Sequence, residues 1–167
     1  NLGITKKPLF GYRNFSEINK LIKLKQKLNL TVGVGLPVYN EEKTLEKILS
    51  VINKCNELID DVVVIIDSRT TDKSAEICAR KKVKFFYDNE IAKLLNIKLV
   101  PGKGWNLWSS VYLLKTDIIV WVDTDVTNFE SRFLTGIIGP LLLDDKIEFV
   151  KGYYHRPKND GRVTEIM

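Results

Sequence analysis

The sequence has few of the residues that build disulfide frameworks or zinc sites, with two cysteines and one histidine among 167 residues. Cys55 and Cys78 have no second Cys or His nearby, so the chain carries neither a zinc pattern nor a redox CxxC motif. Both cysteines fall in predicted helices, and we expect reduced thiols that pack as small apolar residues. Unpaired cysteines favour a cytoplasmic location, which is the one we predict.

Long apolar runs are also absent. The segments Val62–Ile66 and Ile118–Val122 contain five apolar residues each, far fewer than the roughly 18 that a membrane-spanning helix needs. The first 30 residues alternate Lys with apolar residues and lack the continuous apolar core of a signal peptide. We therefore expect no integral membrane segment.

Acidic residues are scarce at the start of the chain. Residues 1–30 contain seven Lys or Arg and one Glu, a local charge of +6, so the remaining residues carry −1 of the total +5. Lys20, Lys23 and Lys27 lie three to four positions apart, which is typical of one solvated helix face. No aromatic residues are interleaved with them in the manner of a nucleic-acid platform, and we expect no nucleic-acid partner.

Hydrophobic residues make up 44% of the chain and charged residues 28%, the balance of an ordinary globular domain. Short apolar runs alternate with segments of helical period. The predicted strands are 31–36, 62–66, 83–87 and 118–122, with 148–154 extended; the predicted helices are 17–28, 41–53, 71–80, 105–115 and 129–143. We expect Pro37 to end the first strand and Asn40 to cap the helix after it. This alternation predicts an α/β domain with a parallel sheet covered by helices on both faces.

Polar groups follow the predicted strands, and ligands of such sheets bind outside the carboxyl ends of the strands. Asp123 and Asp125 come directly after an apolar strand, and their carboxylates suit Mg²⁺ or Mn²⁺ that bridges substrate phosphates. A solvated turn is the alternative interpretation, because Asp is common in turns. Position at the end of a strand makes the two interpretations about equal.

Several motifs together resemble a known family. They are Leu36-Pro-Val-Tyr-Asn-Glu-Glu42, Ile66-Asp-Ser-Arg-Thr-Thr-Asp72, Pro101-Gly-Lys-Gly-Trp-Asn-Leu-Trp108, Asp123-Thr-Asp-Val-Thr-Asn128, Gly139-Pro-Leu-Leu142, Val150-Lys-Gly-Tyr-Tyr-His-Arg-Pro157 and Gly161-Arg-Val-Thr-Glu165. The first two and the Asp-Thr-Asp motif resemble nucleotide-sugar-dependent glycosyltransferases of the GT-A fold, which have a Rossmann-like, mostly parallel sheet. The whole set, from about Asn14 onward, resembles glucosyl-3-phosphoglycerate synthases and the related mannosyl enzymes.

The resemblance implies a role for each matching residue. The implied donor-nucleotide residues are Pro37, Val38, Tyr39, Glu41, Ser68, Lys103 and Asp123. Asp123 and Asp125 would bind the metal and, with Lys103, form the catalytic set, while Gly161, Arg162, Val163 and Thr164 would bind the acceptor. For the acceptor the chemistry agrees, since a small dianion needs Arg and free backbone N–H groups. We interpret Trp105 as a core or packing residue, although its place beside Pro101-Gly-Lys-Gly104 could also let it shape the pocket.

The chain departs from the family at two places. Only Lys158, Asn159 and Asp160 separate Pro157 from Gly161, where relatives have a longer loop, so the choice of acceptor is open. Relatives also use a downstream His as a metal ligand; His155 is not at that position, and we expect it to be a lining or structural residue.

These observations lead to one function with named alternatives. We expect a metal-dependent transfer of a hexose, with UDP-glucose favoured, to 3-phosphoglycerate or a similar phosphorylated acid. The alternatives are a lipid-phosphate or polysaccharide acceptor, and a nucleotide-binding fragment that is inactive alone. Residues 1–30 form the predicted basic arm and helix, and 31–167 the predicted nucleotide-sugar-binding GT-A domain, which we expect to be cut short at its C-terminal end. UDP against GDP, glucose against mannose, and a homodimer are left open.

Overall fold

The computed structural model describes residues 9–152, and helices and strands alternate along this part of the chain. A short 3₁₀ helix, Tyr12–Phe15, comes first. The strands are β1 (Val32–Val38), β2 (Asp61–Ile66), β3 (Lys84–Tyr87) and β4 (Ile118–Trp121), and the helices are α1 (Ile18–Leu28), α2 (Glu42–Asn53), α3 (Ser74–Arg80), α4 (Asp88–Leu95), α5 (Lys103–Leu113) and α6 (Ser131–Leu143). The predicted α/β class is confirmed.

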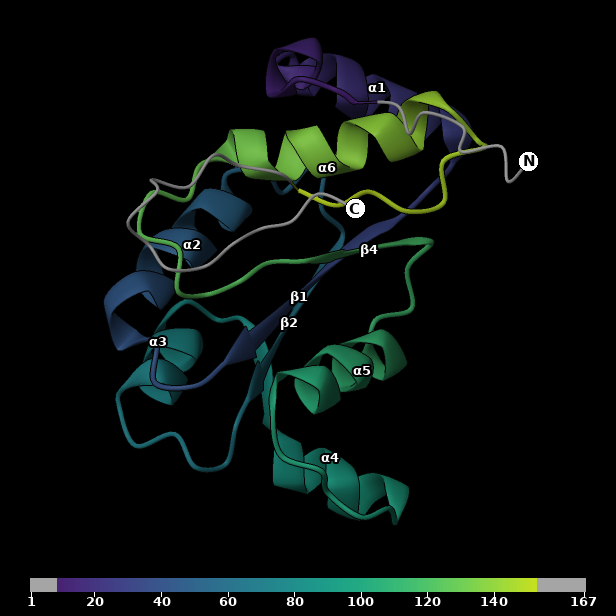
Figure 1. Cartoon of the computed structure of the whole chain (residues 1–167). Helices are drawn as coiled ribbons and strands as arrows, with labels where there is room; N and C mark the ends of the chain where they lie inside the picture. Colours follow the sequence, from purple (N-terminus) through teal and green to yellow (C-terminus); the bar gives the residue numbers. More distant parts are fainter. Residues whose placement is uncertain (1–8, 153–167) are drawn as a thin grey trace, which may run out of the picture.

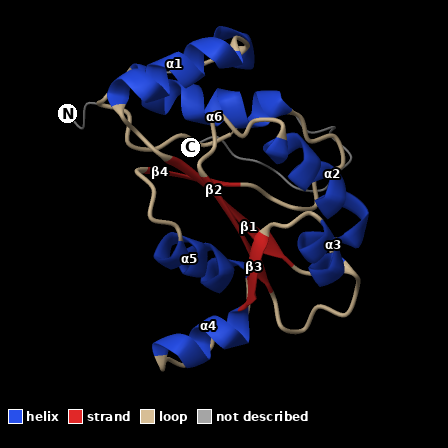
Figure 2. Ribbon diagram, turned by 180° about the vertical axis from the view of Figure 1, so that it is seen from behind, coloured by secondary structure: helices blue, strands red, loops and turns tan. Residues whose placement is uncertain are grey.

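Within the described residues the four strands form one parallel sheet in the order β3-β2-β1-β4. Val34 on β1 is in register with Val62 on β2 and with Val120 on β4. Helices α4 and α5 lie on one side of the sheet, and α1, α2, α3 and α6 lie on the other (Figures 1 and 2). This is the parallel sheet with helices on both faces that the sequence predicts.

The two faces of the sheet bury different halves of each strand, because successive side chains of a strand point to opposite faces. On β2, Val64 and Ile66 pack into the larger core under α1, α2, α3 and α6. Val63 and Ile65 pack with Ile91 of α4 on the opposite face. Both faces are dry, which explains why the strands are continuous apolar runs.

Helix α5 approaches the sheet closely at Gly35 on β1. A Cβ atom at this position would lie 2.6 Å from Ser110 Oγ of the helix, so only glycine leaves room for the contact. The contact presses the middle of α5 onto β1. Its first residue, Lys103, is thereby held near the carboxyl ends of the strands.

The structure corrects the prediction that Pro37 ends the first strand. Strand β1 continues through Pro37 to Val38, and Pro37 pairs with Ile65 of β2. The pairing of β1 with β4 has already stopped at Gly35 and Trp121. Proline has no backbone N–H to donate to a neighbouring strand. Because β4 does not pair with β1 at Pro37, no hydrogen bond of the sheet is lost there.

Asn40 is the second correction, because it does not cap α2. Helix α2 begins at Glu42, its N-cap residue is Glu41, and the Glu42 N–H donates to Asp72 Oδ2 at 2.8 Å. Asn40 instead adopts a left-handed backbone with φ of 54°. Its Oδ1 accepts a hydrogen bond of 2.8 Å from the Thr71 backbone N–H, which ties the loop after β1 to the loop after β2.

Three segments differ from the predicted elements. Helix α4 follows β3 without a connecting residue; no turn signal separates the two patterns, and the sequence therefore predicts no element at these residues. Residues 148–152, predicted to be extended, form neither helix nor strand in the structure. Helix α3 begins at Ser74, a few residues later than predicted.

Lys25 departs from the solvated pattern of the other lysines on α1. Its side chain is 7% exposed, and Nζ lies 2.7 Å from Asp60 Oδ2 and 3.2 Å from the Leu58 carbonyl oxygen. The same Asp60 oxygen accepts a 2.7 Å bond from the Val32 N–H. One carboxylate therefore joins α1 to the first residue of β1.

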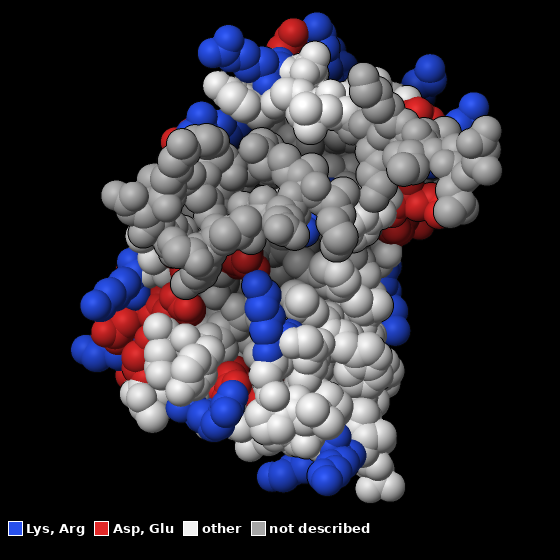
Figure 3. Space-filling model, viewed as in Figure 1, with Lys and Arg blue, Asp and Glu red and all other residues white. Residues whose placement is uncertain are grey.

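The remaining Lys and Arg near the start of the described chain are exposed and gather over α1, at the top of Figure 3. Helix α1 packs against α6. The division of the chain into a basic arm and a nucleotide-sugar-binding region stays a prediction. Within residues 9–152, no helix has both the length and the apolar character needed to cross a membrane.

Cys55 and Cys78 are both unpaired and buried, as predicted. Burial raises the pKa of the Cys78 thiol to about 11 and also raises that of Cys55. Because the thiolate is the reactive form, we expect neither thiol to react with Ellman's reagent in the folded protein and both to react after unfolding in urea. Rapid reaction of either thiol without denaturant would contradict this.

Candidate active site

The candidate site lies where the order of strands in the sheet reverses, between β1 and β4. The chain runs outward from β1 through β2 to β3, then returns to place β4 on the free side of β1. Ligands of open parallel sheets bind at the carboxyl ends of strands on either side of such a point. The residues beyond these ends are Tyr39 after β1, Ser68 after β2, and Asp123 and Asp125 after β4.

The loop that carries Asp123 and Asp125 is anchored by side chains. Buried Thr124, between the two carboxylates, donates from Oγ1 to the Pro37 carbonyl oxygen at 2.6 Å. Its own carbonyl oxygen accepts a 2.5 Å bond from Thr44 Oγ1 of α2. Further along the loop, Lys47 Nζ donates to the Thr127 carbonyl oxygen at 2.7 Å. The first turns of α2 therefore fix the carboxylate loop against the end of β1.

Lys103 brings the start of α5 to this loop. Its Nζ lies 2.5 Å from Asp123 Oδ1, and both side chains are about half exposed. Gly102, before the helix, has φ of 132°, a conformation that L side chains rarely adopt. No side chain caps the helix N-terminus. The Lys103 ammonium at the start of this uncapped helix therefore contacts Asp123.

The opposite wall of the site is acidic. Partial burial raises the pKa of Glu41, and the nearby carboxylates of Asp125 and Asp72 raise it further, while a hydrogen bond from Thr44 opposes the shift. Carboxylates that lie close together create a negative potential that a cation would relieve. The charge at this position therefore suits a divalent cation next to Asp125.

Tyr39 and Ser68 lie on adjacent loops. Tyr39 is 54% exposed, and the Arg69 guanidinium lies over its ring, 5.4 Å from the centroid. The Ser68 N–H donates to Oδ1 of buried Asp88 at 2.9 Å. The Asp67 N–H donates to the Val38 carbonyl oxygen at 2.9 Å. These bonds hold the ends of β1 and β2 in one surface.

The predicted donor and metal residues thus lie around one edge of the sheet, at the ends of β1, β2 and β4 and the start of α5. The predicted acceptor residues Gly161, Arg162, Val163 and Thr164, together with His155, lie outside the described residues. Between residues 9 and 152, no three His, Cys, Asp or Glu side chains cluster closely enough to hold a metal by themselves. Each residue's role remains a prediction.

Sequence reasoning missed three residues that shape this edge. Thr44 and Thr124 hold the carboxylate loop, and Arg69 pairs with Asp67. The signal for Thr124 was present, since a hydroxyl between two carboxylates can bond back to the chain while both neighbours stay free. Nothing in the local pattern distinguishes Thr44 or Arg69 from surface residues.

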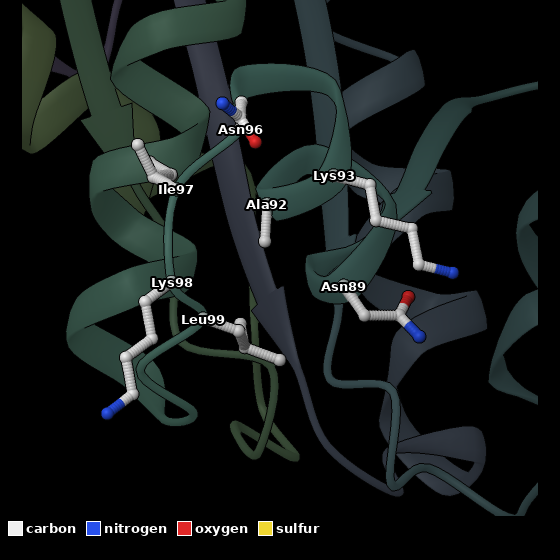
Figure 4. Close-up of a pocket in the computed structure, with 7 residues that line it drawn as sticks. All are labelled: Asn89, Ala92, Lys93, Asn96, Ile97, Lys98 and Leu99. Atoms are coloured by element: carbon white, nitrogen blue, oxygen red, sulfur yellow. The ribbon is translucent and has the colours of Figure 1, made fainter.

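A separate open pocket of about 480 Å³ lies between α4 and residues 97–99 (Figure 4). Lys93 and Lys98 line it, but their ammonium groups point away from one another in Figure 4. The pocket therefore offers no converging charges to a ligand, and the edge of the sheet is the better candidate.

Comparison with known proteins agrees with this geometry. The sequence profile of Glycosyl transferase family 2 matches residues 34–165, which include every motif of the candidate site. The chain belongs to Glycosyl transferase family 2. Glucosyl-3-phosphoglycerate synthase of Petrotoga mobilis is 36% identical over 172 residues, which cover 95% of this chain and 52% of that protein. The chain spans about half the length of the curated synthases it matches.

Solved structures of related family members extend the likeness to three dimensions. Mannosyl-3-phosphoglycerate synthase from Rubrobacter xylanophilus superposes with a TM-score of 0.81 at 28% identity, over 93% of this chain and 49% of that one. Glucosyl-3-phosphoglycerate synthase from Mycobacterium tuberculosis, crystallised with Mn²⁺, UDP and glucosyl-3-phosphoglycerate, gives a TM-score of 0.71 at 27% identity, over 86% of this chain and 48% of that one. This family 2 glycosyltransferase chain therefore shares its GT-A fold with both sugar-phosphoglycerate synthases.

Proposed function

We propose that this protein transfers glucose from UDP-glucose to 3-phosphoglycerate with the help of Mg²⁺ or Mn²⁺. The observation that carries the proposal is the contact of 2.5 Å between Lys103 Nζ and Asp123 Oδ1. It lies at the edge of the sheet where the order of strands reverses. This contact supports a nucleoside diphosphate site formed by the lysine, the N-terminus of α5 and the two aspartates of the loop. The likeness to synthases of this class supports the same substrates.

The donor set fits a hard divalent cation. Asp125 and Asp123 provide carboxylate oxygens, and Mg²⁺ is usually held by one or two carboxylates together with substrate phosphates. The raised pKa of Glu41 beside Asp125 is consistent with a site whose charge is balanced by a cation. When bound, the metal supplies charge neutralisation for the leaving diphosphate.

Lys103 and the first turn of α5 would bind and orient the same diphosphate. An exposed ammonium can leave Asp123 for a phosphate oxygen without an unfavourable burial step. The helix N-terminus adds free N–H donors, which favour negative charge. In this arrangement Tyr39, Val38 and Ser68 would hold the uridine, and positioning would provide much of the rate.

Acceptor binding is assigned to Gly161, Arg162, Val163 and Thr164 on sequence grounds. A phosphorylated acid of three carbons carries two anionic groups, which an Arg fork and backbone N–H groups can bind. Only three residues separate Pro157 from Gly161, so the assay below includes other acceptors besides 3-phosphoglycerate.

The proposal is tested by incubating the purified protein with UDP-glucose, 3-phosphoglycerate and Mg²⁺ or Mn²⁺, and by measuring UDP release and the glucosylated product. GDP-mannose, a polyprenyl phosphate and an oligosaccharide serve as alternative substrates. Product from UDP-glucose and 3-phosphoglycerate alone supports the proposal. UDP release with another acceptor would contradict the acceptor, and no reaction with any pair would contradict the catalytic assignment.

Lys103→Ala is expected to lower kcat/KM for UDP-glucose about 100-fold, the order of effect seen when a donor to developing negative charge is removed. Lys98→Ala, an exposed lysine on the segment before α5, is the matched control and should behave as wild type. Equal activity of the two variants would remove Lys103 from the proposed mechanism.

We further propose a cytoplasmic location, which the two unpaired cysteines support. A homodimer is proposed as the assembly, and its test is light scattering during size-exclusion chromatography. A single mass equal to that of the 19.2 kDa chain would contradict it.

A further inference from the structure

Arg69 links the loops after β1 and β2 and had no role in the predicted site. Its Nε donates to Asp67 Oδ1 at 2.8 Å, and Nη2 donates to Asp67 Oδ2 at 2.5 Å. The guanidinium carbon lies 5.4 Å from the centroid of the Tyr39 ring. One side chain therefore contacts an acidic residue at the end of β2 and an aromatic residue just beyond β1.

Asp67 is occupied by this contact and is not available to a ligand. Its side chain is 4% exposed, and Oδ1 also accepts a 2.9 Å bond from the Arg69 backbone N–H. A carboxylate that receives two parallel N–H bonds fixes the plane of the guanidinium as well as its position. Asp67 thus acts on a ligand only through Arg69.

The guanidinium keeps open surface toward solvent. It has five N–H groups, and within residues 9–152 only two of them donate hydrogen bonds, both to Asp67. The Arg69 side chain is 59% exposed, and the Tyr39 ring beneath it is also exposed. Together they form a flat cationic and aromatic surface beside Val38 and Ser68, which we assign to the nucleotide.

We propose that Arg69 contacts the base of the donor nucleotide and that the Asp67–Arg69–Tyr39 cluster forms a stacking surface for it. The inference rests on the proposed function, since it needs a nucleotide at this edge of the sheet. A planar, delocalised guanidinium stacks on aromatic rings and bases, whereas an ammonium offers only a point charge. Arg69 would therefore contribute to binding through its shape as well as its charge.

The test is a calorimetric titration of UDP in the presence of Mn²⁺, with Arg69→Lys as the principal variant. Lysine keeps a cation beside buried Asp67 but loses the planar surface, and we expect UDP to bind about tenfold more weakly. Arg80→Lys is the matched control, because Arg80 is also ion-paired and 60% exposed, but pairs with Glu46 of α2. It should bind UDP as wild type does.

Two further measurements separate a base contact from a structural role. Inorganic pyrophosphate with Mn²⁺ should bind equally to wild type and Arg69→Lys, because it has no base. The double variant Arg69→Ala/Asp67→Asn removes both charges, so that no buried carboxylate is left without its partner. Its affinity for UDP should fall at least as much as that of Arg69→Lys, while its affinity for pyrophosphate should be unchanged.

Unchanged UDP affinity in Arg69→Lys would overturn the inference, as would a parallel loss of UDP and pyrophosphate affinity. Both results would leave the proposed function intact. A wild-type protein that binds pyrophosphate but not UDP would instead contradict the proposed function, and the inference would fail with it.

Discussion

Replacing Asp125 with alanine is expected to reduce kcat about 1,000-fold and to abolish the dependence of activity on Mn²⁺ concentration. Charge stabilisation by a bound divalent cation is worth several kcal/mol in the transition state, and about 4 kcal/mol corresponds to this loss of rate. The same variant should lose most of its Mn²⁺-dependent UDP binding in a calorimetric titration. Asp125 is exposed on a loop, so its replacement leaves the core intact.

Asp145→Ala is the matched control for this prediction. Asp145 is also an exposed loop aspartate, placed after α6. It should keep the metal dependence and activity of the wild type. If Asp125→Ala retained full activity and an unchanged response to Mn²⁺, the metal role assigned to the loop would be wrong.

Replacing Asp60 with alanine should lower the free energy of unfolding by about 3 kcal/mol, because it leaves the Lys25 ammonium in a buried position without its partner. It also removes the acceptor of the Val32 N–H at the start of β1. For a chain of this size, the loss corresponds to a Tm lower by roughly 6–12 °C. Thermal unfolding followed by circular dichroism measures the change.

Replacement of the other member of this ion pair, Lys25, should have a smaller effect. Lys25→Met removes the buried charge and keeps an unbranched side chain, while Asp60, at 38% side-chain exposure, can be solvated; we expect a change within about 1 kcal/mol of wild type. The double variant Lys25→Met/Asp60→Asn, which keeps an acceptor for Val32, should be close to Lys25→Met. Equal destabilisation by Asp60→Ala and Lys25→Met would contradict the asymmetry.

The parts of the fold that depend on burial could be predicted from the sequence. Leu45, Ile48, Leu49 and Ile52 have the i, i+3, i+4, i+7 spacing of one helix face, and all four are buried on α2. The run Val62–Ile66 forms all of β2 after Asp61. A strand that is buried on both faces has no polar positions, so the sequence shows it as a continuous apolar run. The convergence of Tyr39, Ser68 and Asp123 then follows from topology, since parallel strands end on one edge.

The parts that depend on single polar contacts between distant segments could not be predicted. Asn40 has the residue type of a helix cap, but its amide oxygen bonds to Thr71, 31 positions away. Lys25 belongs to a lysine-rich helix and is buried only because Asp60 reaches it. Arg69 gained a role only when its guanidinium was placed over Tyr39. Local patterns carry no information about such partners.

Pro37 also influences how the loop with Asp123 and Asp125 is attached to the sheet. Hydrogen bonding between β1 and β4 ends where the Val122 N–H meets the Gly35 carbonyl oxygen, and a proline two residues later cannot extend the ladder. The loop with Asp123 and Asp125 therefore does not pair with β1 through its backbone. The hydroxyl groups of Thr44 and Thr124 hold it instead. Pro37 thus marks the position where backbone pairing between β1 and β4 gives way to side-chain bonds that hold the two aspartates beyond the sheet.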